Sequence, residues 1–518
     1  MTSTSVNEAG SASGPEFVPD RRFRTIFLAL MLAVFLAAIE QSTMATATRT
    51  IVDDLHGFDL QAWATTAFLV TSTLSTPLYG KLSDIYGRRR LFLFSIALFV
   101  AGSLLCGLAT TMPQLAACRA VQGLGAGGIM ALALIIVGDL VPPRQRARYQ
   151  AFFMIVFATS SVAGPVVGGL FAGADSILGV TGWRWLFFLN LPLGGLALAV
   201  VARVLHLPRR VVPQRIDWAG AILLLVTLLP LLTVAEQGRM WGWSSPVAWL
   251  CYTLTAAGLA GFVIAERTMR DEALLPLRLF RDRTVAIGSF SCAVTGMAMF
   301  SGMLIVPLYM QIVRGMSPTA AGLRMLPFVA GIMAGSLTSG HLIARTGRYR
   351  LYPVAGTFAM AAGMLVLAMA GAATSLWWIT VVSVLIGVGL GCNMQPMITA
   401  MQNAVADRDI GVTTSIAILC RSLGGTLGTA ALIGVLLAVL PNRVADAYAH
   451  AGQQPPAQLT DGSFLTDTSF LNNLPGAAAQ PFRDGFAGSV QVVFLVAFAV
   501  VLTGALLNLG LTEKAPAA

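Results

Sequence analysis

The sequence predicts an all-α integral membrane protein with fourteen transmembrane helices, and three observations carry that prediction. Of the 518 residues, 56% are hydrophobic and only 11% are charged, whereas soluble domains carry about 25% charged residues. The mean hydropathy is +0.77. Long apolar runs recur along most of the chain. These values exclude an ordinary soluble enzyme, a disordered chain and a nucleic-acid-binding protein.

Each predicted helix is a run of about 20 apolar residues, the length that crosses the hydrocarbon core of a bilayer. The first run follows a polar tail, residues 1–25, that we expect to be disordered. Because this run lacks a small-residue cleavage site, we expect a span and not a cleavable signal peptide. The fourteen runs are 26–47, 61–80, 91–110, 113–139, 149–173, 185–205, 217–235, 246–266, 285–310, 320–343, 352–370, 375–399, 411–440 and 489–510.

The distribution of Lys and Arg predicts the orientation of these spans. Most of the 33 basic residues fall on one side when the N-terminus is placed in the cytoplasm, for example in segments 88–90 and 144–148. We therefore expect a multi-pass protein of the plasma (inner) membrane with both termini in the cytoplasm, including a short tail at 511–518. The same bias explains the basic pI of about 9.8 without a nucleic-acid partner.

An internal repeat links the two halves of the chain. Residues 80–90 and residues 340–350 both read Gly-x6-Gly-Arg-x-Arg, and they are 260 residues apart. Repeats of this kind are typical of secondary transporters. The second copy has Ala344 where the first has Asp84, so the two halves have diverged.

Further motifs follow in a fixed order. Besides 80–90, they are 119–125, 164–169, 183–192, 217–220, the residues Gln311, Gly315, Ser317, Pro318, Gly322 and Pro327, and 421–425. In this order they resemble the major facilitator superfamily, and more narrowly its fourteen-helix drug:proton antiporters, which are multidrug efflux transporters. The resemblance covers nearly all of residues 26–440.

The resemblance implies two six-helix bundles and an inserted helix pair. The expected parts are a first bundle at 26–205, the inserted pair with its cytoplasmic loops at 206–284, and a second bundle at 285–510. The second bundle includes a polar extracellular loop at 441–488, which we expect to be a flexible flap or a small ordered cap.

The sharpest single signal for function is Glu40, because a carboxylate within a membrane span is costly and marks a functional site by default. It is a candidate to carry a proton, although it could also be a hydrated pore residue or half of a structural ion pair. Similar antiporters usually have Asp here. Helical rise places Arg119 at about the same depth, which permits a pair. The resemblance assigns Arg119 to proton coupling; a clamp between helices is the alternative.

Two groups of residues are candidates for gating. The resemblance implies a charge relay of Asp84, Arg88 and Asp139 that latches the two halves, although these charges could merely fix topology. It also implies a hinge in the fifth span, for which close packing is the alternative. The complete gating set is Gly80, Asp84, Gly87, Arg88, Asp139, Gly164, Pro165 and Gly168.

A third group could face a central cavity that takes the cargo. Polar candidates lie deep in their spans, and the methionine and tryptophan candidates could form an adaptable apolar surface. For each of these apolar side chains, packing in the core or against lipid is the alternative. The set is Met44, Trp63, Gln122, Met154, Asn393, Gln395 and Arg421, and for Arg421 the sequence names no partner.

These features predict a proton-coupled exporter of amphipathic or cationic organic compounds that works by alternating access. The chain has no Gly-x4-Gly-Lys-Ser/Thr motif, so we expect the proton motive force to drive it, with no cofactor and no metal. We expect a monomer and no enzymatic activity. The alternatives are an exporter of a lipid or an endogenous secondary metabolite, and a transporter-like sensor without flux.

Overall fold

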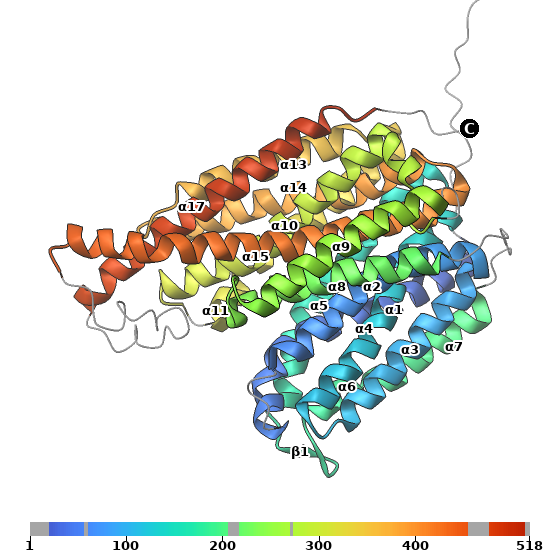
Figure 1. Ribbon diagram of the computed structural model, residues 1–518, viewed down its shortest axis with the longest axis horizontal. Coiled ribbons are helices and arrows are strands. Elements are labelled where there is room, and N and C mark those ends of the chain that lie inside the picture. The colour runs from blue at the N-terminus through green and yellow to red at the C-terminus, as the bar shows by residue number, and fades with distance from the viewer. Residues whose placement is uncertain are drawn as a thin grey trace, which may run out of the picture.

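The structure is a computed structural model that describes residues 20–55, 61–205, 217–269, 273–316, 318–453 and 476–512. This part of the chain is almost entirely helical (Figure 1). It also contains one antiparallel strand pair, β1 (Ser176–Ile177) and β2 (Val180–Thr181). Residues 1–19 of the predicted tail, 454–475 of the predicted loop and 513–518 lie outside the described residues.

The first half of the chain forms one helical bundle. Its first helix begins at Arg21, before the predicted start at residue 26, because the Asp20 carboxylate accepts a hydrogen bond from the N–H of Phe23 at 2.6 Å and caps the helix. The helices are α1 (Arg21–Leu55), α2 (Gln61–Tyr86), α3 (Arg88–Leu108), α4 (Met112–Leu140), α5 (Pro143–Ala172), α6 (Arg184–Phe188) and α7 (Asn190–Val204).

The second half forms a second bundle, beginning with a short 3-10 helix, η3 (Leu277–Arg281). Another 3-10 helix, η4 (Asp407–Asp409), precedes α15. The α-helices are α10 (Arg283–Ile312), α11 (Pro318–Leu323), α12 (Leu326–Thr346), α13 (Leu351–Ala368), α14 (Leu376–Asn403), α15 (Ile410–His450) and α17 (Gly476–Asn508).

The predicted loop over 441–488 is partly helical. α15 continues to His450 and α17 begins at Gly476, so both helices run into this polar segment. The extensions hold together because Val444, Tyr448 and Phe482 are buried. Gly485 lets the two backbones approach so closely that a Cβ there would lie 2.7 Å from the Val444 Cα.

The inserted segment forms a helix pair, α8 (Trp218–Trp241) and α9 (Pro246–Met269). The two helices pack on each other, and α8 also contacts α2 of the first bundle and α15 of the second. The Asp217 side chain caps α8 by accepting from the N–H of Gly220 at 2.7 Å. The pair therefore lies beside the boundary between the bundles (Figure 1).

Among the described residues, twelve helices are long and apolar enough to cross a membrane, so the predicted count of fourteen is not confirmed. The other two predicted spans form the long helices α2 and α5. Hydroxyl side chains crowd the centre of α2 and bond to carbonyls of their own helix. Examples are Thr71 to Ala67 at 2.8 Å and Thr76 to Ser72 at 2.9 Å.

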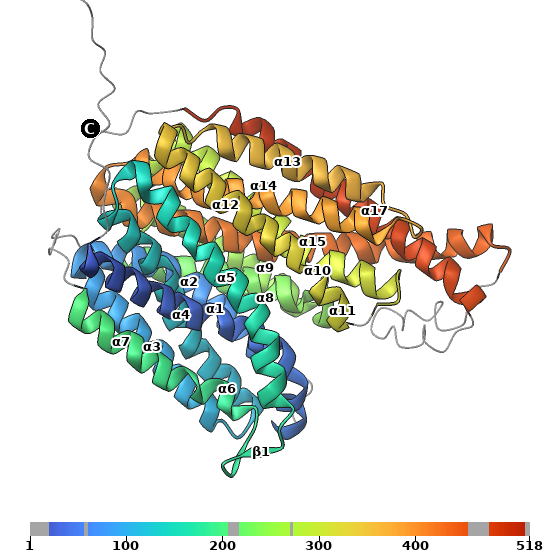
Figure 2. The same cartoon turned by 180° about the vertical axis from the view of Figure 1, so that it is seen from behind.

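The two bundles meet at the terminus end, where α1 begins and α17 ends, and they diverge toward the far end (Figures 1 and 2). The contact at the terminus end is close. A Cβ on Gly340 of α12 would lie 2.7 Å from the Ala147 carbonyl oxygen of α5. Arg146, the residue before Ala147 on α5, donates to the Asn403 side chain at 3.1 Å.

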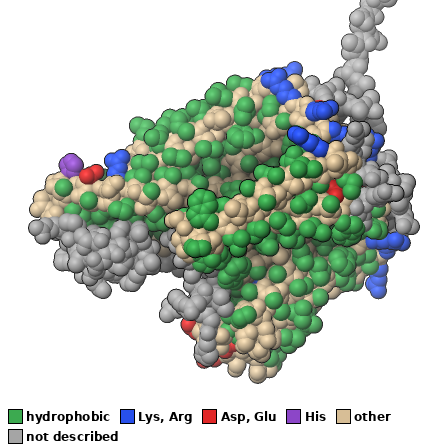
Figure 3. Space-filling view, viewed as in Figure 1, with side chains coloured by type: hydrophobic (Ala, Val, Ile, Leu, Met, Phe, Trp, Pro, Cys, Tyr) green, Lys and Arg blue, Asp and Glu red, His purple; other side chains and the backbone are tan. Residues whose placement is uncertain are grey.

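Apolar side chains cover the outer faces of the helices, and on the face in Figure 3 Lys and Arg gather mainly toward the terminus end. Trp377, Leu28 and Trp249 are 74%, 67% and 61% exposed. A soluble monomer rarely exposes so large an apolar surface, whereas lipid covers such a surface in a membrane protein. The chain is therefore an all-α integral membrane protein.

Close helix contacts in the first bundle depend on glycine. A Cβ on Gly125 of α4 would overlap the backbone of Phe99 in α3, whereas a Cβ on Gly169 of α5 would have no atom within 4 Å. Gly125→Val should therefore lower the free energy of unfolding by about 1–3 kcal/mol or more, because the added side chain overpacks the contact. It should also lower the monodisperse fraction in detergent size-exclusion chromatography. Gly169→Val is the matched control and should elute like the parent; equal loss in both variants would contradict this account.

Candidate functional site

Glu40 of α1 and Arg119 of α4 form an ion pair within the first bundle. The Arg119 Nη1 lies 2.7 Å from the Glu40 Oε1. Glu40 is 3% exposed and Arg119 is fully buried. The structure thus brings together the two charged residues that helical rise placed at equal depth.

The ion pair belongs to a larger buried network. Asn190 of α7 donates to the second Glu40 oxygen, Oε2, at 2.6 Å. Arg119 also donates to the Gln122 side chain at 2.8 Å, and Gln122 in turn donates to the Ser103 hydroxyl of α3 at 2.6 Å. Helices α1, α3, α4 and α7 therefore converge on one polar cluster in which both carboxylate oxygens are bonded.

Sequence reasoning missed two members of this network, Asn190 and Ser103. Asn190 stands in the 183–192 motif, which was recognised without a role for its amide. Ser103 carried no signal beyond being a hydroxyl within a span. Gln122, predicted to line a cavity, has its side chain within this network and is fully buried.

The guanidinium group of Arg119 is held on its remaining sides. Its Nε donates to the Ala64 carbonyl at 3.2 Å. The group lies 4.3 Å from the ring centroid of Phe68 and 5.9 Å from that of Phe187, in cation–π geometry. A buried ion pair must be bonded this completely, because desolvating two charges costs several kcal/mol per ion. Neutralising Glu40 would leave Arg119 uncompensated.

The second bundle has a polar cluster on the corresponding helices, but its side chains are neutral. The Asn393 amide of α14 accepts from Thr295 at 2.9 Å and donates to Thr357 at 2.9 Å. Asn508 of α17 also donates to Thr357, at 2.7 Å. Helices α10, α13, α14 and α17 thus supply amides and hydroxyls where α1, α3, α4 and α7 supply an ion pair. The Asn393 amide, a predicted cavity group, is bonded within this cluster.

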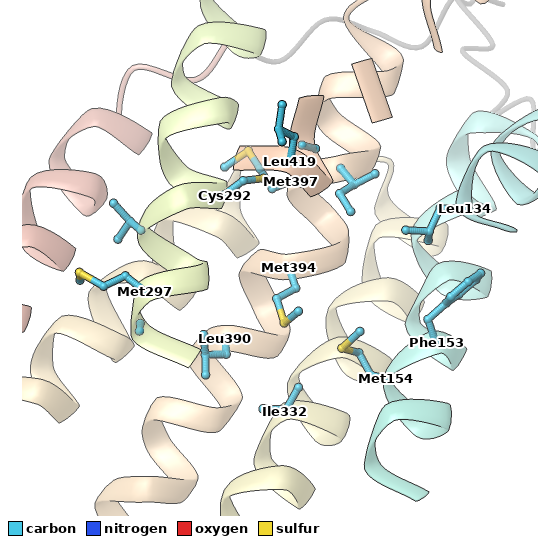
Figure 4. Close-up of a cluster of buried hydrophobic side chains, with 14 of the residues drawn as sticks. Leu134, Phe153, Met154, Cys292, Met297, Ile332, Leu390, Met394, Met397 and Leu419 are labelled. Atoms are coloured by element: carbon cyan, nitrogen blue, oxygen red, sulfur yellow. The ribbon is translucent and has the colours of Figure 1, made fainter. Parts of the chain in front are cut away.

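The other predicted cavity residues are spread over both bundles. Met44 is buried, and Trp63 lies 6.4 Å from the Trp241 ring of α8. Met154 of α5 lies near Met394 and Ile332 at the boundary between the bundles (Figure 4).

Two polar cavity candidates lie near this boundary. Gln395 is 1% exposed, and its Oε1 has no hydrogen-bond partner among the described residues. Arg421 of α15 is half-buried and donates to the Met394 carbonyl at 3.3 Å.

The predicted gating residues gather at the terminus end. Arg88 forms ion pairs with Asp84 and with Asp139, the second at 2.9 Å. The first turn of α15 packs on this cluster, since a Cβ on Gly411 would lie 2.8 Å from an Asp84 oxygen and 3.0 Å from the Arg88 Nη1. The cluster of the first bundle is therefore in contact with the second.

Asp84 lies beyond the apolar segment 61–80, in the last turn of α2. Burial raises the pKa of its carboxyl group to about 6, against the opposing effect of Arg88. This carboxylate therefore takes up a proton at a higher pH than an exposed aspartate does.

Two of the predicted gating positions at this end require glycine, each for a different structural reason. Gly80 faces Ser415 of α15, and a Cβ there would overlap the Ser415 side chain. Gly87 joins α2 to α3 with φ +92°, a conformation that glycine adopts readily.

Neutral side chains also bridge the bundles at the terminus end, and sequence reasoning missed them. We call this set the amide seal: Gln150 of α5, Thr399 and Gln402 of α14, and Thr414 of α15. Gln150 donates to Gln402 at 3.1 Å and accepts from Thr399 at 3.1 Å. Gln402 then donates to Thr414 at 2.8 Å. All four side chains are at most 1% exposed.

The predicted hinge lies where α5 packs on α1. A Cβ on Gly164 would overlap the Ser42 side chain, and the Ser42 hydroxyl donates to the Ser160 carbonyl at 2.9 Å. Gly168 is also buried, whereas the side chain of Pro165 lies outside the described part. The contact itself is close packing, and the hinge role stays a prediction.

In the part of the chain that the structure describes, no three His, Cys, Asp or Glu side chains gather where a metal ion could bind.

Comparison with known proteins agrees with this architecture. A family model described as Major Facilitator Superfamily matches residues 30–429. An uncharacterized MFS-type transporter of Mycobacterium tuberculosis is 35% identical over 98% of this chain and 72% of its own length. Multidrug resistance protein 3 of Bacillus subtilis is 32% identical over 93% of each chain. The solved structure of the proton:xylose symporter XylE matches with a TM-score of 0.58 at 15% identity, covering 94% of this chain and 96% of that one.

The amide seal can be tested by hydrogen exchange. Gln402→Ala removes two neutral hydrogen bonds worth about 0.5–1.5 kcal/mol each, so exchange in peptides covering 399–414 should quicken several-fold or more. Gln491→Ala is the matched control, since this amide donates to the Ala370 carbonyl at the far end, at 3.2 Å. Unchanged exchange at 399–414 in the Gln402 variant would show that the seal contributes nothing to closure.

Proposed function

The chain belongs to the Major Facilitator Superfamily, whose members are transporters and not enzymes. From that premise we propose that it is a proton-coupled exporter of amphipathic organic compounds that works by alternating access. In this proposal the proton motive force supplies the work, and the protein acts as a monomer in the plasma membrane with both termini in the cytoplasm.

The observation that carries the proposal is the buried Glu40–Arg119 pair. Glu40 is the acid of the pair, and its two oxygens are bonded to Arg119 at 2.7 Å and Asn190 at 2.6 Å. Adding a proton to Glu40 removes its charge and releases Arg119 from it. Because an uncompensated buried cation is costly, the cluster must rearrange or admit water when Glu40 takes up a proton. Proton uptake is thereby linked to a change of conformation.

The proton motive force supplies enough free energy for export. One elementary charge crossing 100 mV releases about 2.3 kcal/mol, which sustains roughly a fifty-fold concentration ratio. With the termini in the cytoplasm, contact at the terminus end and divergence at the far end correspond to an outward-facing state. Reaching the inward-facing state requires the amide seal to open and Gly411 to leave the Asp84–Arg88 cluster.

The proposed cargo class rests on the family resemblance and on one relative's name, multidrug resistance protein. Amphipathic compounds, cationic ones included, are the first candidates. The methionines at the bundle boundary, Met154 and Met394, support an apolar cargo body because their side chains adapt in shape. Export of a lipid or a secondary metabolite and a sensor without flux are the alternatives. Vesicle transport with and without a pH gradient, over a panel of compounds, separates them.

Glu40→Gln tests the proton site, because it imitates the permanently protonated acid at nearly constant volume. The variant should lose pH-driven uptake into inside-out vesicles by at least about tenfold, comparable to losing one charge-assisted interaction. Counterflow of labelled for unlabelled cargo should survive, because exchange needs alternating access without net proton movement.

Asp53→Asn is the control for Glu40→Gln, since Asp53 is an exposed carboxylate of the same helix. It should keep the parental rate in both assays. If Glu40→Gln drives uptake at the parental rate, the proton site lies elsewhere and this proposal fails.

The charge cluster of Asp84, Arg88 and Asp139, where α2 joins α3, tests gating. Asp84→Asn and Arg88→Ala should each lower flux while leaving cargo binding and expression near parental levels, because they bias a conformational equilibrium without touching cargo. Arg90→Ala, at an exposed arginine of the same motif, should change neither quantity. Equal losses of binding and flux would argue against a pure gating role.

A further inference from the structure

Arg421 is a cation within a predicted membrane span, and no carboxylate lies within 4.0 Å of its guanidinium group in the described part of the chain. Its Nη2 donates to the Met394 carbonyl at 3.3 Å. Its Nε is buried without a hydrogen-bond partner. Burying a cation within a membrane span costs free energy, so such a residue marks a functional site by default.

The position of Arg421 relates it to the boundary between the bundles. On α15 it lies seven residues beyond Thr414 of the amide seal, which is about two helical turns, roughly 10 Å, toward the far end on the same helix face. Met394, whose carbonyl it reaches, stands opposite Met154 of the first bundle in Figure 4. Arg421 therefore lies against α14 of its own bundle, about two helical turns further from the terminus end than the seal.

The charges within the membrane spans favour the binding of an anion at Arg421. Glu40, the acid among the functional candidates that lies within a membrane span, is 3% exposed and already paired with Arg119 at 2.7 Å. The corresponding cluster of the second bundle consists of neutral amides and hydroxyls, Asn393 and Asn508 among them. In this conformation, Arg421 is therefore a charged side chain without an ion-pair partner among the described residues.

We propose that Arg421 binds an anionic group of the cargo, so that the exporter selects amphipathic compounds that carry a carboxylate, sulfonate or phosphate. This inference rests on the proposed export function and narrows its cargo class. The planar guanidinium group matches the oxygens of such groups and can donate two parallel hydrogen bonds to them. Met394, whose carbonyl Arg421 reaches, and Met154 are each only 4% exposed; in this proposal their adaptable side chains move to take the body of the cargo.

Two fluorescent probes with one ring system isolate the charge. 8-Anilinonaphthalene-1-sulfonate is an amphipathic anion, and N-phenyl-1-naphthylamine is its neutral counterpart without the sulfonate. Binding of both is measured to the full-length protein in nanodiscs, with the signal of empty nanodiscs subtracted. No pH gradient is present, so the result does not depend on proton coupling.

The parent should bind the sulfonate more tightly than the neutral probe. Arg421→Gln should weaken sulfonate binding by at least about tenfold, the scale of a hydrogen bond to a charged group, and leave binding of the neutral probe unchanged. Arg421→Lys should fall between the two, because it keeps the charge and loses the fork. Retained binding of the neutral probe shows that the variants are folded.

Arg314→Gln is the matched control. Arg314 also donates to a backbone carbonyl, that of Ala372 at 3.0 Å, but its side chain is exposed near the end of α10. This variant should bind both probes like the parent. The proposal is overturned if Arg421→Gln keeps the sulfonate affinity, if it loses both probes equally, or if the parent prefers the neutral probe. Failure of pH-driven flux in vesicles would instead refute the proposed export drive and leave the binding ratio standing.

Discussion

The buried pair of Glu40 and Arg119 constrains the whole first bundle. Each ion costs several kcal/mol to desolvate, so the pair persists only where every polar direction is satisfied. That requirement explains why a carboxamide from α7, a glutamine from α4 and a carbonyl of α2 all converge on two side chains. It also explains why α1, α3, α4 and α7 must keep one mutual arrangement while Glu40 is charged. In the proposed mechanism, the charge state of Glu40 decides whether this arrangement is the favourable one.

The two halves have corresponding helices, but those helices carry different charged side chains. Where the first half has an ion pair, the second has Asn393 and Asn508 among hydroxyls, and where the first has Asp84, the second has Ala344. Neutral amides do not change charge between pH 5 and 8, so in the proposed mechanism the proton acts on the first bundle. The second bundle would then respond through the first turn of α15 and the residues of the amide seal on α14.

Sequence reasoning reached what depends on spacing along one helix. Helical rise alone placed Glu40 and Arg119 at one depth, and the repeat with its motifs gave the family and the fold. It could not reach Ser103, Asn190 or the pair of Gln150 and Gln402, because those contacts depend on the rotation of helices that are far apart in sequence. The helical extensions of α15 and α17 were missed because a polar segment becomes helical only when a neighbour buries its few apolar side chains.

The amide seal that closes the terminus end and the ion pair in the core of the first bundle differ in strength. The seal consists of neutral hydrogen bonds, each worth about 0.5–1.5 kcal/mol net, and water can replace them when the bundles part. The core pair cannot exchange its partners for water so cheaply while it stays buried. In the proposed mechanism, a boundary that opens at small cost lies next to a core that is stable in one charge state only. Protonation of Glu40 then shifts the balance between the closed and the open boundary.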